Sequence, residues 1–79
     1  MQRSINVTPL KAIRLQRGLS LTEVSTAVHI DSGNLSRIER RQQTPSLELA
    51  ERLSKFYGAA VTEMQILYPE RFMQEGGDV

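Results

Sequence analysis

Two side chains in the middle of the chain, those of Asn34 and Arg37, are of types that can contact the edges of nucleic-acid bases. Ser32 and Gly33 lie just before them. An arginine can donate two hydrogen bonds to guanine O6 and N7, and an asparagine can pair with adenine N6 and N7; each contact gives about 1–3 kcal/mol of discrimination. Asn34 and Arg37 would share one face of a helix. A solvent-exposed polar helix face has the same pattern, so the residues alone leave both interpretations open.

A polar segment follows these positions and supplies hydrogen-bond donors that suit phosphate groups. It consists of Arg40, Arg41, Gln42, Gln43 and Thr44. Phosphate contacts fix register and affinity but carry little sequence information, and each neutralised phosphate steepens the dependence of log affinity on log salt by about 0.9. Lys11 and Arg17 could assist from an earlier segment, although simple solvation explains them equally well.

The sequence offers no constellation for catalysis or for metal binding. It has no cysteine and a single histidine, His29, so a thiolate or histidine cluster cannot be assembled around a metal ion. We find no nucleophile paired with a base and no phosphate-cradling glycine loop. We therefore predict that the protein is not an enzyme and uses neither a metal nor another cofactor.

Charge is distributed unevenly along the 79 residues, although the formal net charge is only +1. Up to Pro45 there are seven basic residues against three acidic ones, whereas from Ser46 onward there are three against six. This division predicts a cationic surface on the first part of the domain, where a polyanion would bind. The lack of cysteine suits a reducing compartment, and no apolar stretch approaches the roughly 20 residues of a membrane span. We expect a cytoplasmic protein without a membrane partner.

Helical start and stop signals define the elements that must carry these residues. Thr8 is an N-cap followed by proline, Ser20 begins a capping box with Glu23, and Asp31 and Ser46 are further N-caps. The expected helices cover 9–17, 21–28, 32–40, 47–57 and about 61–67, with glycines at 18 and 58 as C-terminal stops.

Apolar residues at helical spacing within these segments predict one core. The expected inward residues are Val24, Ala27, Val28, Leu35, Ile38, Leu49, Ala50, Leu53, Phe56, Tyr57, Val61, Met64 and Leu67 or Tyr68. We predict an all-α fold, a compact five-helix bundle. The expected organisation is an N-terminal arm over 1–8, one domain over 9–68 and a partly disordered tail over 69–79.

From Leu21 to Arg40 the sequence resembles the helix-turn-helix of the Cro/cI-repressor-type (XRE) family of transcriptional regulators. The neighbouring helices extend the resemblance over roughly 10–67, and the segments 35–40 and 45–47 are typical of the family. The apolar positions of the motif are Val24, Val28, Ile30, Leu35 and Ile38. The resemblance implies a lambda-repressor-like DNA-binding domain whose second and third helices form the motif, with the third helix in the major groove.

The resemblance also implies roles for single residues. It assigns base contacts to the four positions 32, 33, 34 and 37, and phosphate contacts to the segment 40–44 and to the helix start at Ser20 and Leu21, through backbone N–H groups. It implies a structural ion pair between Arg14 and Glu39, whose disruption would cost several kcal/mol. Asp31 is expected to cap its helix, since its charge would repel phosphate.

Three positions depart from the family pattern. Ser25 replaces a usual alanine, and its hydroxyl needs an acceptor, such as a carbonyl one turn back. His29 replaces a turn glycine and can adopt the left-handed conformation at a cost on the order of 1 kcal/mol. Leu21 replaces a glutamine that binds phosphate in many phage repressors, and a leucine side chain cannot make that hydrogen bond.

The leading hypothesis is a sequence-specific regulator, in particular a repressor, that binds a palindromic operator in double-stranded DNA as a homodimer. Half-sites on one face of the duplex would be about 34 Å apart. The expected dimer surface comprises Met64, Ile66, Leu67, Tyr68 and Phe72, although several of these residues could instead complete the core. The alternative is a protein-interaction module, such as an antitoxin or an antirepressor partner, that uses the C-terminal segment after Leu67.

Overall fold

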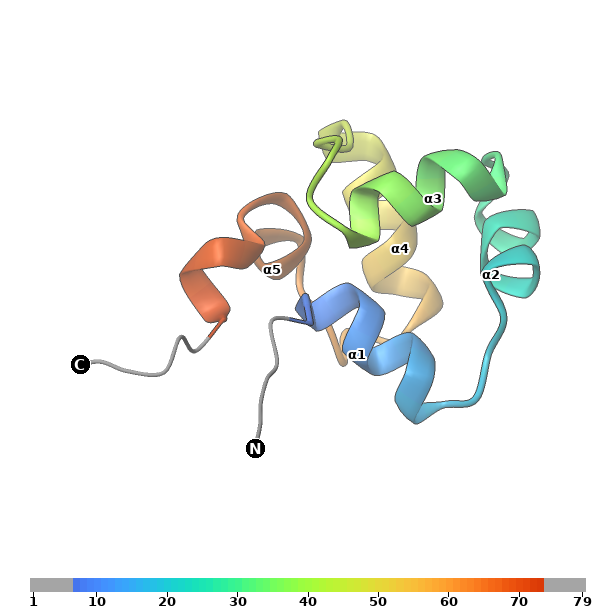
Figure 1. Cartoon of the computed structure of the whole chain (residues 1–79), viewed down its shortest axis with the longest axis horizontal. Helices are drawn as coiled ribbons and strands as arrows, with labels where there is room; N and C mark the ends of the chain where they lie inside the picture. The colour runs from blue at the N-terminus through green and yellow to red at the C-terminus, as the bar shows by residue number, and fades with distance from the viewer. Residues whose placement is uncertain (1–6, 74–79) are drawn as a thin grey trace.

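The structure, a computed structural model, describes residues 7–73, which form helices joined by short connections (Figure 1). The elements are α1 (Pro9–Gln16), α2 (Leu21–Val28), α3 (Ser32–Glu39), α4 (Leu47–Phe56), α5 (Glu63–Leu67) and the 3-10 helix η1 (Pro69–Phe72). The prediction of an all-α domain of five short helices is confirmed. The 3-10 helix η1 lies in the segment predicted to be a partly disordered tail. Residues 1–6 of the expected arm and 74–79 of the expected tail lie outside the described residues.

The helices begin where their capping residues predict. The side chains of Thr8, Ser20, Asp31 and Ser46 each accept a hydrogen bond from the backbone N–H three residues later. Ser20 and Glu23 form the complete capping box. Each bond satisfies a backbone donor that the first helical turn leaves without an intrahelical partner.

The start of α5 differs from the prediction by two residues. Thr62 and Gln65 form a second capping box, in which Thr62 N donates to Gln65 Oε1 at 2.9 Å and Gln65 N donates to Thr62 Oγ1 at 3.2 Å. Val61 therefore lies before the helix, where it is buried in the core. Threonine followed three residues later by glutamine is a recognisable sequence signal for this start.

One hydrophobic core joins all five α-helices. Its buried residues are Leu10, Val24, Val28, Leu35, Ile38, Leu49, Ala50, Leu53, Tyr57, Val61 and Ile66. Three residues predicted to face inward are exposed: Ala27, Phe56 at 37% and Met64 at 46%. Within residues 7–73, none of the helices has the length and apolar character that crossing a membrane requires.

The arrangement separates the two ends of the molecule. In Figure 1, α2 lies at one end of the molecule and α5 and η1 lie at the other, α3 runs from α2 toward the middle, and α1 and α4 lie between the two ends. α3 packs on α2, α2 also packs on α4, and α4 packs on α5. The outer face of α3 thus remains uncovered by the other helices.

Candidate nucleic-acid interface

A three-residue turn holds α3 at a fixed angle to α2. His29 ends α2 in the left-handed conformation, with φ of 63°. The next residue, Ile30, donates its N–H to Ser25 O at 2.9 Å. Ser25 in turn is buried and donates its hydroxyl to Thr22 O at 3.2 Å, which is the acceptor one turn back that the serine requires.

Two of the three buried residues of α3, Leu35 and Ile38, are apolar, and the third is Glu39. Arg14 of α1 meets Glu39 in a bidentate ion pair: Arg14 Nε lies 2.8 Å from Oε2, and Nη2 lies 3.0 Å from Oε1. The hydrogen bond to Glu39 raises the pKa of Arg14 against the lowering effect of burial. Thr8 adds a hydroxyl bond of 2.7 Å to the backbone oxygen of Glu39. These contacts fix the C-terminal end of α3 to α1.

The opposite face of α3 carries a second arginine, which is exposed and forms a cluster with two half-buried amide side chains. Arg37 donates Nε to Gln43 Oε1 at 3.1 Å and Nη2 to Asn34 Oδ1 at 2.6 Å. We call these three residues the Arg37 cluster. The sequence analysis placed Asn34 and Arg37 on one face, which the structure has, but it assigned Gln43 to phosphate. The contact of Gln43 with Arg37 depends on the path of the loop, for which the sequence carries no local signal.

Gly33 lies beside the cluster and leaves space for the helix cap. Asp31 accepts the N–H of Asn34 at 3.2 Å, as expected of an N-cap. A Cβ at position 33 would lie 2.9 Å from Asp31 Oδ2 and 3.6 Å from Arg37 Nη1. The glycine therefore accommodates the capping carboxylate, a role that sequence reasoning did not identify. Ser32, the remaining predicted base-contacting residue, is exposed at the helix start.

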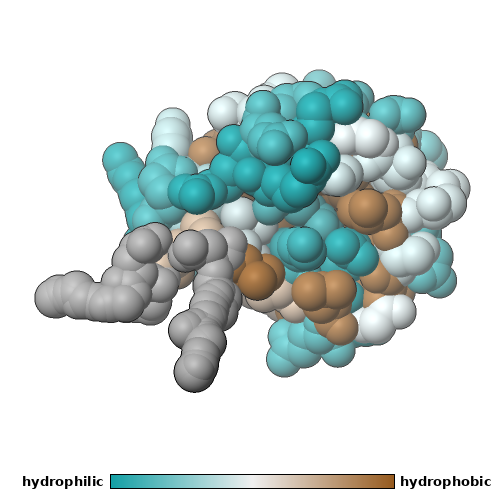
Figure 2. Space-filling model, in the orientation of Figure 1, coloured by the Kyte–Doolittle hydropathy of each residue, from teal (hydrophilic) through white to brown (hydrophobic). Residues whose placement is uncertain are grey.

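The segment after α3 presents the polar side chains predicted to contact phosphate. Arg40, Arg41, Gln42 and Thr44 are exposed, and Arg41 turns the chain with φ of 65°. Arg40 folds back along α3, where Nε donates to Ser36 O and Oγ, each at 3.2 Å. Figure 2 shows hydrophilic side chains gathered over this end of α3 and the following loop.

Lys11 joins this surface from α1. It lines a recess of about 180 Å³ together with Arg40, Arg41 and Thr8. The sequence analysis left the role of Lys11 open. Its position offered a signal, because residues 11 and 14 lie on one face of a helix, and Arg14 pairs with the end of α3.

Other basic and polar candidates have structural partners. Arg17 donates to Tyr57 O at 3.3 Å and lies 5.6 Å from the centre of the Tyr57 ring, so it stabilises the fold. The backbone N–H of Ser20 donates to Glu23 Oε1 at 2.8 Å and is therefore not free for phosphate. Leu21 packs partly against the core. Among residues 7–73, no three His, Cys, Asp or Glu side chains gather as metal ligands would.

The expected dimer surface requires one correction. Met64, Tyr68 and Phe72 are 46%, 43% and 44% exposed, and Leu67 is partly buried. Ile66 is only 3% exposed and belongs to the core, so its assignment to an intermolecular surface was wrong. Five helical residues are too few for their spacing to fix which side faces inward.

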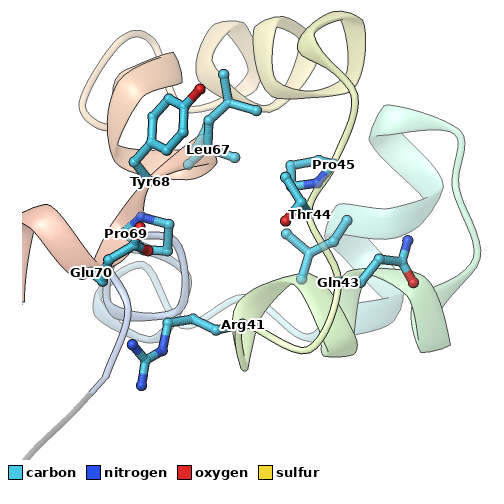
Figure 3. A pocket seen from close by; sticks show the side chains of 10 residues that line it. Arg41, Gln43, Thr44, Pro45, Leu67, Tyr68, Pro69 and Glu70 are labelled. Atoms are coloured by element: carbon cyan, nitrogen blue, oxygen red, sulfur yellow. The ribbon is translucent and has the colours of Figure 1, made fainter.

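A cleft of about 280 Å³ separates the loop after α3 from the C-terminal elements. Figure 3 shows Arg41 and Gln43 on one side of it and Tyr68, Pro69 and Glu70 on the other. Its lining also includes the apolar residues Ile38, Pro45, Ile66 and Leu67.

Comparison with known proteins gives matches over the same part of the chain. Residues 10–64 match the helix-turn-helix family. The cryptic phage CTXphi transcriptional repressor RstR of Vibrio cholerae is 31% identical over 55 residues, which are 70% of this chain and 50% of that protein. The HTH-type transcriptional regulator DdrOP3 of Deinococcus deserti is 36% identical over 55 residues, 70% of this chain and 43% of that protein. The chain thus spans half or less of these relatives. No solved structure matches it significantly.

Proposed function

This chain belongs to the helix-turn-helix family, and we propose that it is a sequence-specific regulator of transcription, in particular a repressor, that binds double-stranded DNA with α3 in the major groove. The observation that carries the proposal is the division of α3 into two faces. One face is held by the core and by the Arg14–Glu39 pair, and the other exposes Arg37. The relatives named as a repressor and a regulator support the same function.

In the proposed complex, one group of residues contacts the bases and a second group contacts the sugar-phosphate backbone. Ser32, Gly33, Asn34 and Arg37 face the base edges, where they supply sequence preference. Lys11, Arg41, Gln42 and Thr44 contact the sugar-phosphate backbone, together with Arg40 where its guanidinium extends beyond Ser36. The N-terminal end of α2, through Ser20 Oγ and Leu21 N–H, approaches a phosphate of the same groove. The positive charge of the first three helices and the loop after them steers this approach.

We further propose that two copies of the chain bind a palindromic operator. A single α3 of eight residues contacts only one half-site, whereas a two-fold dimer places two such helices about 34 Å apart on one face of the duplex. Met64, Tyr68 and Phe72 support this part of the proposal, because each is a large side chain more than two-fifths exposed at the end of the molecule opposite α2.

Selection of sites from random duplex DNA, followed by binding measurements on the recovered site, tests the proposal. We expect an inverted repeat and an affinity that falls steeply with salt. Replacement of Arg41 by alanine should lower affinity for all sequences alike and reduce the salt slope by about 0.9 for each phosphate that is no longer neutralised. Lys55→Ala, an exposed charge in the last turn of α4, is the matched control and should change neither quantity. A folded protein that enriches no sequence and binds duplex DNA without salt dependence would contradict the proposal and favour the protein-interaction alternative.

A further inference from the structure

The Arg37 cluster gives α3 a preference that its residue types alone do not predict. We infer that Asn34, Arg37 and Gln43 act as one unit that presents hydrogen-bond donors to the major groove and therefore selects guanine. This arrangement differs from one in which Asn34 recognises an adenine and Arg37 separately recognises a guanine. The inference rests on the proposed function of α3 and names the base chemistry that this surface takes. In this unit Gln43 is a positioning residue, because it acts through Arg37.

The two amide oxygens bind the same edge of the Arg37 guanidinium. Nε and Nη2 lie along one side of the planar group, and they donate to Gln43 Oε1 at 3.1 Å and to Asn34 Oδ1 at 2.6 Å. Within residues 7–73, Nη1 has no hydrogen-bond partner. The end of the guanidinium, formed by Nη1 and the second N–H of Nη2, therefore stays available. This end offers the parallel pair of donors that fits guanine O6 and N7.

Asn34 is poorly placed to recognise adenine in this arrangement. Bidentate pairing with adenine needs Oδ1 as the acceptor of the N6 amino group while Nδ2 donates to N7. Oδ1 already accepts a charge-assisted hydrogen bond from Arg37 at 2.6 Å. A base amino group that approached this oxygen would also approach the positive charge of the arginine, so Asn34 contributes its Nδ2 donors instead.

Gln43 holds the guanidinium from a different element of the chain. It lies in the loop after α3 and is partly buried, and the preceding residue is tied to the helix by a bond of 2.8 Å from Gln42 N to Arg37 O. Its Oε1 thus fixes Arg37 before DNA arrives, so the long side chain has less freedom to lose on binding. The Nε2 donors of Gln43 are not used in this contact, so a phosphate contact through Nε2 would leave the bond to Arg37 intact.

A unit that offers only donors favours bases whose major-groove edge presents acceptors. In the major groove guanine presents two acceptors and thymine presents O4, whereas adenine presents one acceptor, N7, beside an amino donor, and cytosine presents an amino donor. Guanine opposite Arg37 satisfies the two parallel N–H groups at the free end of the guanidinium. The Nδ2 donors of Asn34 then favour a guanine or a thymine at the adjoining position. The half-site should accordingly contain a guanine next to a guanine or a thymine.

The test uses the full chain and the half-site recovered by selection, with each base replaced in turn and affinities compared by fluorescence anisotropy. We expect the unaltered protein to prefer guanine over adenine at one position by about 5- to 150-fold, the range of a good bidentate contact. Replacement of that guanine by 7-deazaguanine, which lacks the N7 acceptor, should remove most of the preference.

Gln43 variants separate positioning from phosphate binding. Gln43→Ala should reduce the guanine-over-adenine ratio by about three- to tenfold, since a charge-assisted hydrogen bond to Arg37 is removed. Gln43→Glu, which keeps an acceptor oxygen, should retain the ratio. In the Arg37→Ala background, Gln43→Ala should change the ratio no further. Gln42→Ala, which removes a proposed phosphate contact from the same loop, should lower the affinity for both bases alike and leave the ratio unchanged. Unfolding curves of the exposed-loop variants establish that each is folded.

The outcomes distinguish this inference from the proposed function. If the unaltered chain selects a defined site but Gln43→Ala weakens all sequences equally, or if Asn34→Ala removes a preference for adenine, the inference is overturned and the proposed function stands. If the chain selects no site at all, the proposed function itself fails.

Discussion

Two arginines on opposite sides of α3 show how surroundings decide what one functional group does. Arg14 is 8% exposed and donates two hydrogen bonds to the carboxylate of Glu39, with a third to Leu19 O at 2.9 Å. Arg37 is exposed and donates two hydrogen bonds to neutral amide oxygens. Arg14 has its charge neutralised inside the protein, so it belongs to the fold. Arg37 keeps its charge at the surface, where it remains available to an anionic partner.

The two arginine sites are mechanically connected through α3. Residues 37 and 39 are two positions apart on a helix, so their side chains project about 200° apart around its axis. The Arg14–Glu39 pair therefore sets the rotation and depth at which Arg37 is presented. Loss of the Arg14–Glu39 pair should therefore appear as a change in the free energy of unfolding, whereas loss of Arg37 should appear as a change in DNA binding.

Loss of the buried pair should give the largest effect. Glu39→Ala leaves the Arg14 guanidinium buried without its carboxylate, and we expect the free energy of unfolding to fall by about 3–5 kcal/mol. Urea denaturation followed by circular dichroism measures this change. Glu51→Ala, an exposed carboxylate on α4, should stay within about 0.5 kcal/mol of the unaltered protein. Equal losses in the two variants would show that the pair contributes no more than a surface charge.

The buried residue Tyr57 makes the stability of the protein depend on alkaline pH. Burial, and secondarily the negative charge of Glu39, raise the pKa of Tyr57 to about 12, against the lowering effects of Arg14 and Arg17. A raised pKa in the folded state means that stability is complete below the ordinary value of 10.0 and is lost as pH rises toward 12. The free energy of unfolding should fall by about 3 kcal/mol across that window, because each pKa unit corresponds to about 1.4 kcal/mol.

Tyr57→Phe should remove this alkaline dependence. At neutral pH it should change stability by less than about 1 kcal/mol, since Tyr57 Oη has no hydrogen-bond partner among the described residues and phenylalanine keeps the ring in place. Chemical denaturation at pH 7, 10 and 11.5 measures both effects. Tyr68→Phe, which alters a side chain 43% exposed, should keep the full alkaline loss. A loss of the same size in the Tyr57→Phe variant would assign the titration to another group.

The sequence predicted those features of this molecule that depend on neighbouring residues. Thr8, Ser20, Asp31 and Ser46 start four helices because each N-cap acts on a backbone group three residues away. The pairing of Arg14 with Glu39 was available only through the family resemblance, since 25 positions separate the two residues. The contact between Gln43 and Arg37 depends on how the loop turns at Arg41, whose positive φ no residue type there signals.

Replacement of Arg37 should weaken DNA binding and keep stability, whereas replacement of Glu39 should lower stability. Arg37→Ala is expected to leave the free energy of unfolding within about 0.5 kcal/mol, because the side chain is exposed. The binding of this variant to the selected operator should be weaker by about 1–3 kcal/mol of free energy, and its preference at one base position should relax. Anisotropy titrations against the operator and against random DNA measure the two affinities. Unchanged discrimination between these duplexes would remove Arg37 from the base-contacting set.

A net stability effect close to zero is also expected at Gly33, which lies against the exposed arginine. Gly33→Ala should gain about 1 kcal/mol of helix propensity. Its Cβ would meet Asp31 Oδ2 at 2.9 Å, however, and displacement of a capping carboxylate costs about the same amount. The two terms should cancel to within about 0.5 kcal/mol.

The Asp31→Ala background separates these opposing terms. Without the carboxylate there is no cap to displace, so Gly33→Ala should then stabilise the protein by the full helix-propensity term of about 1 kcal/mol. Affinity for DNA should fall in either background, because the added methyl group lies 3.6 Å from Arg37 Nη1 and projects from the face proposed to meet the bases. If Gly33→Ala stabilised the protein equally with and without Asp31, the glycine would have no role in accommodating the cap, and its contribution would lie wholly on the DNA-binding side.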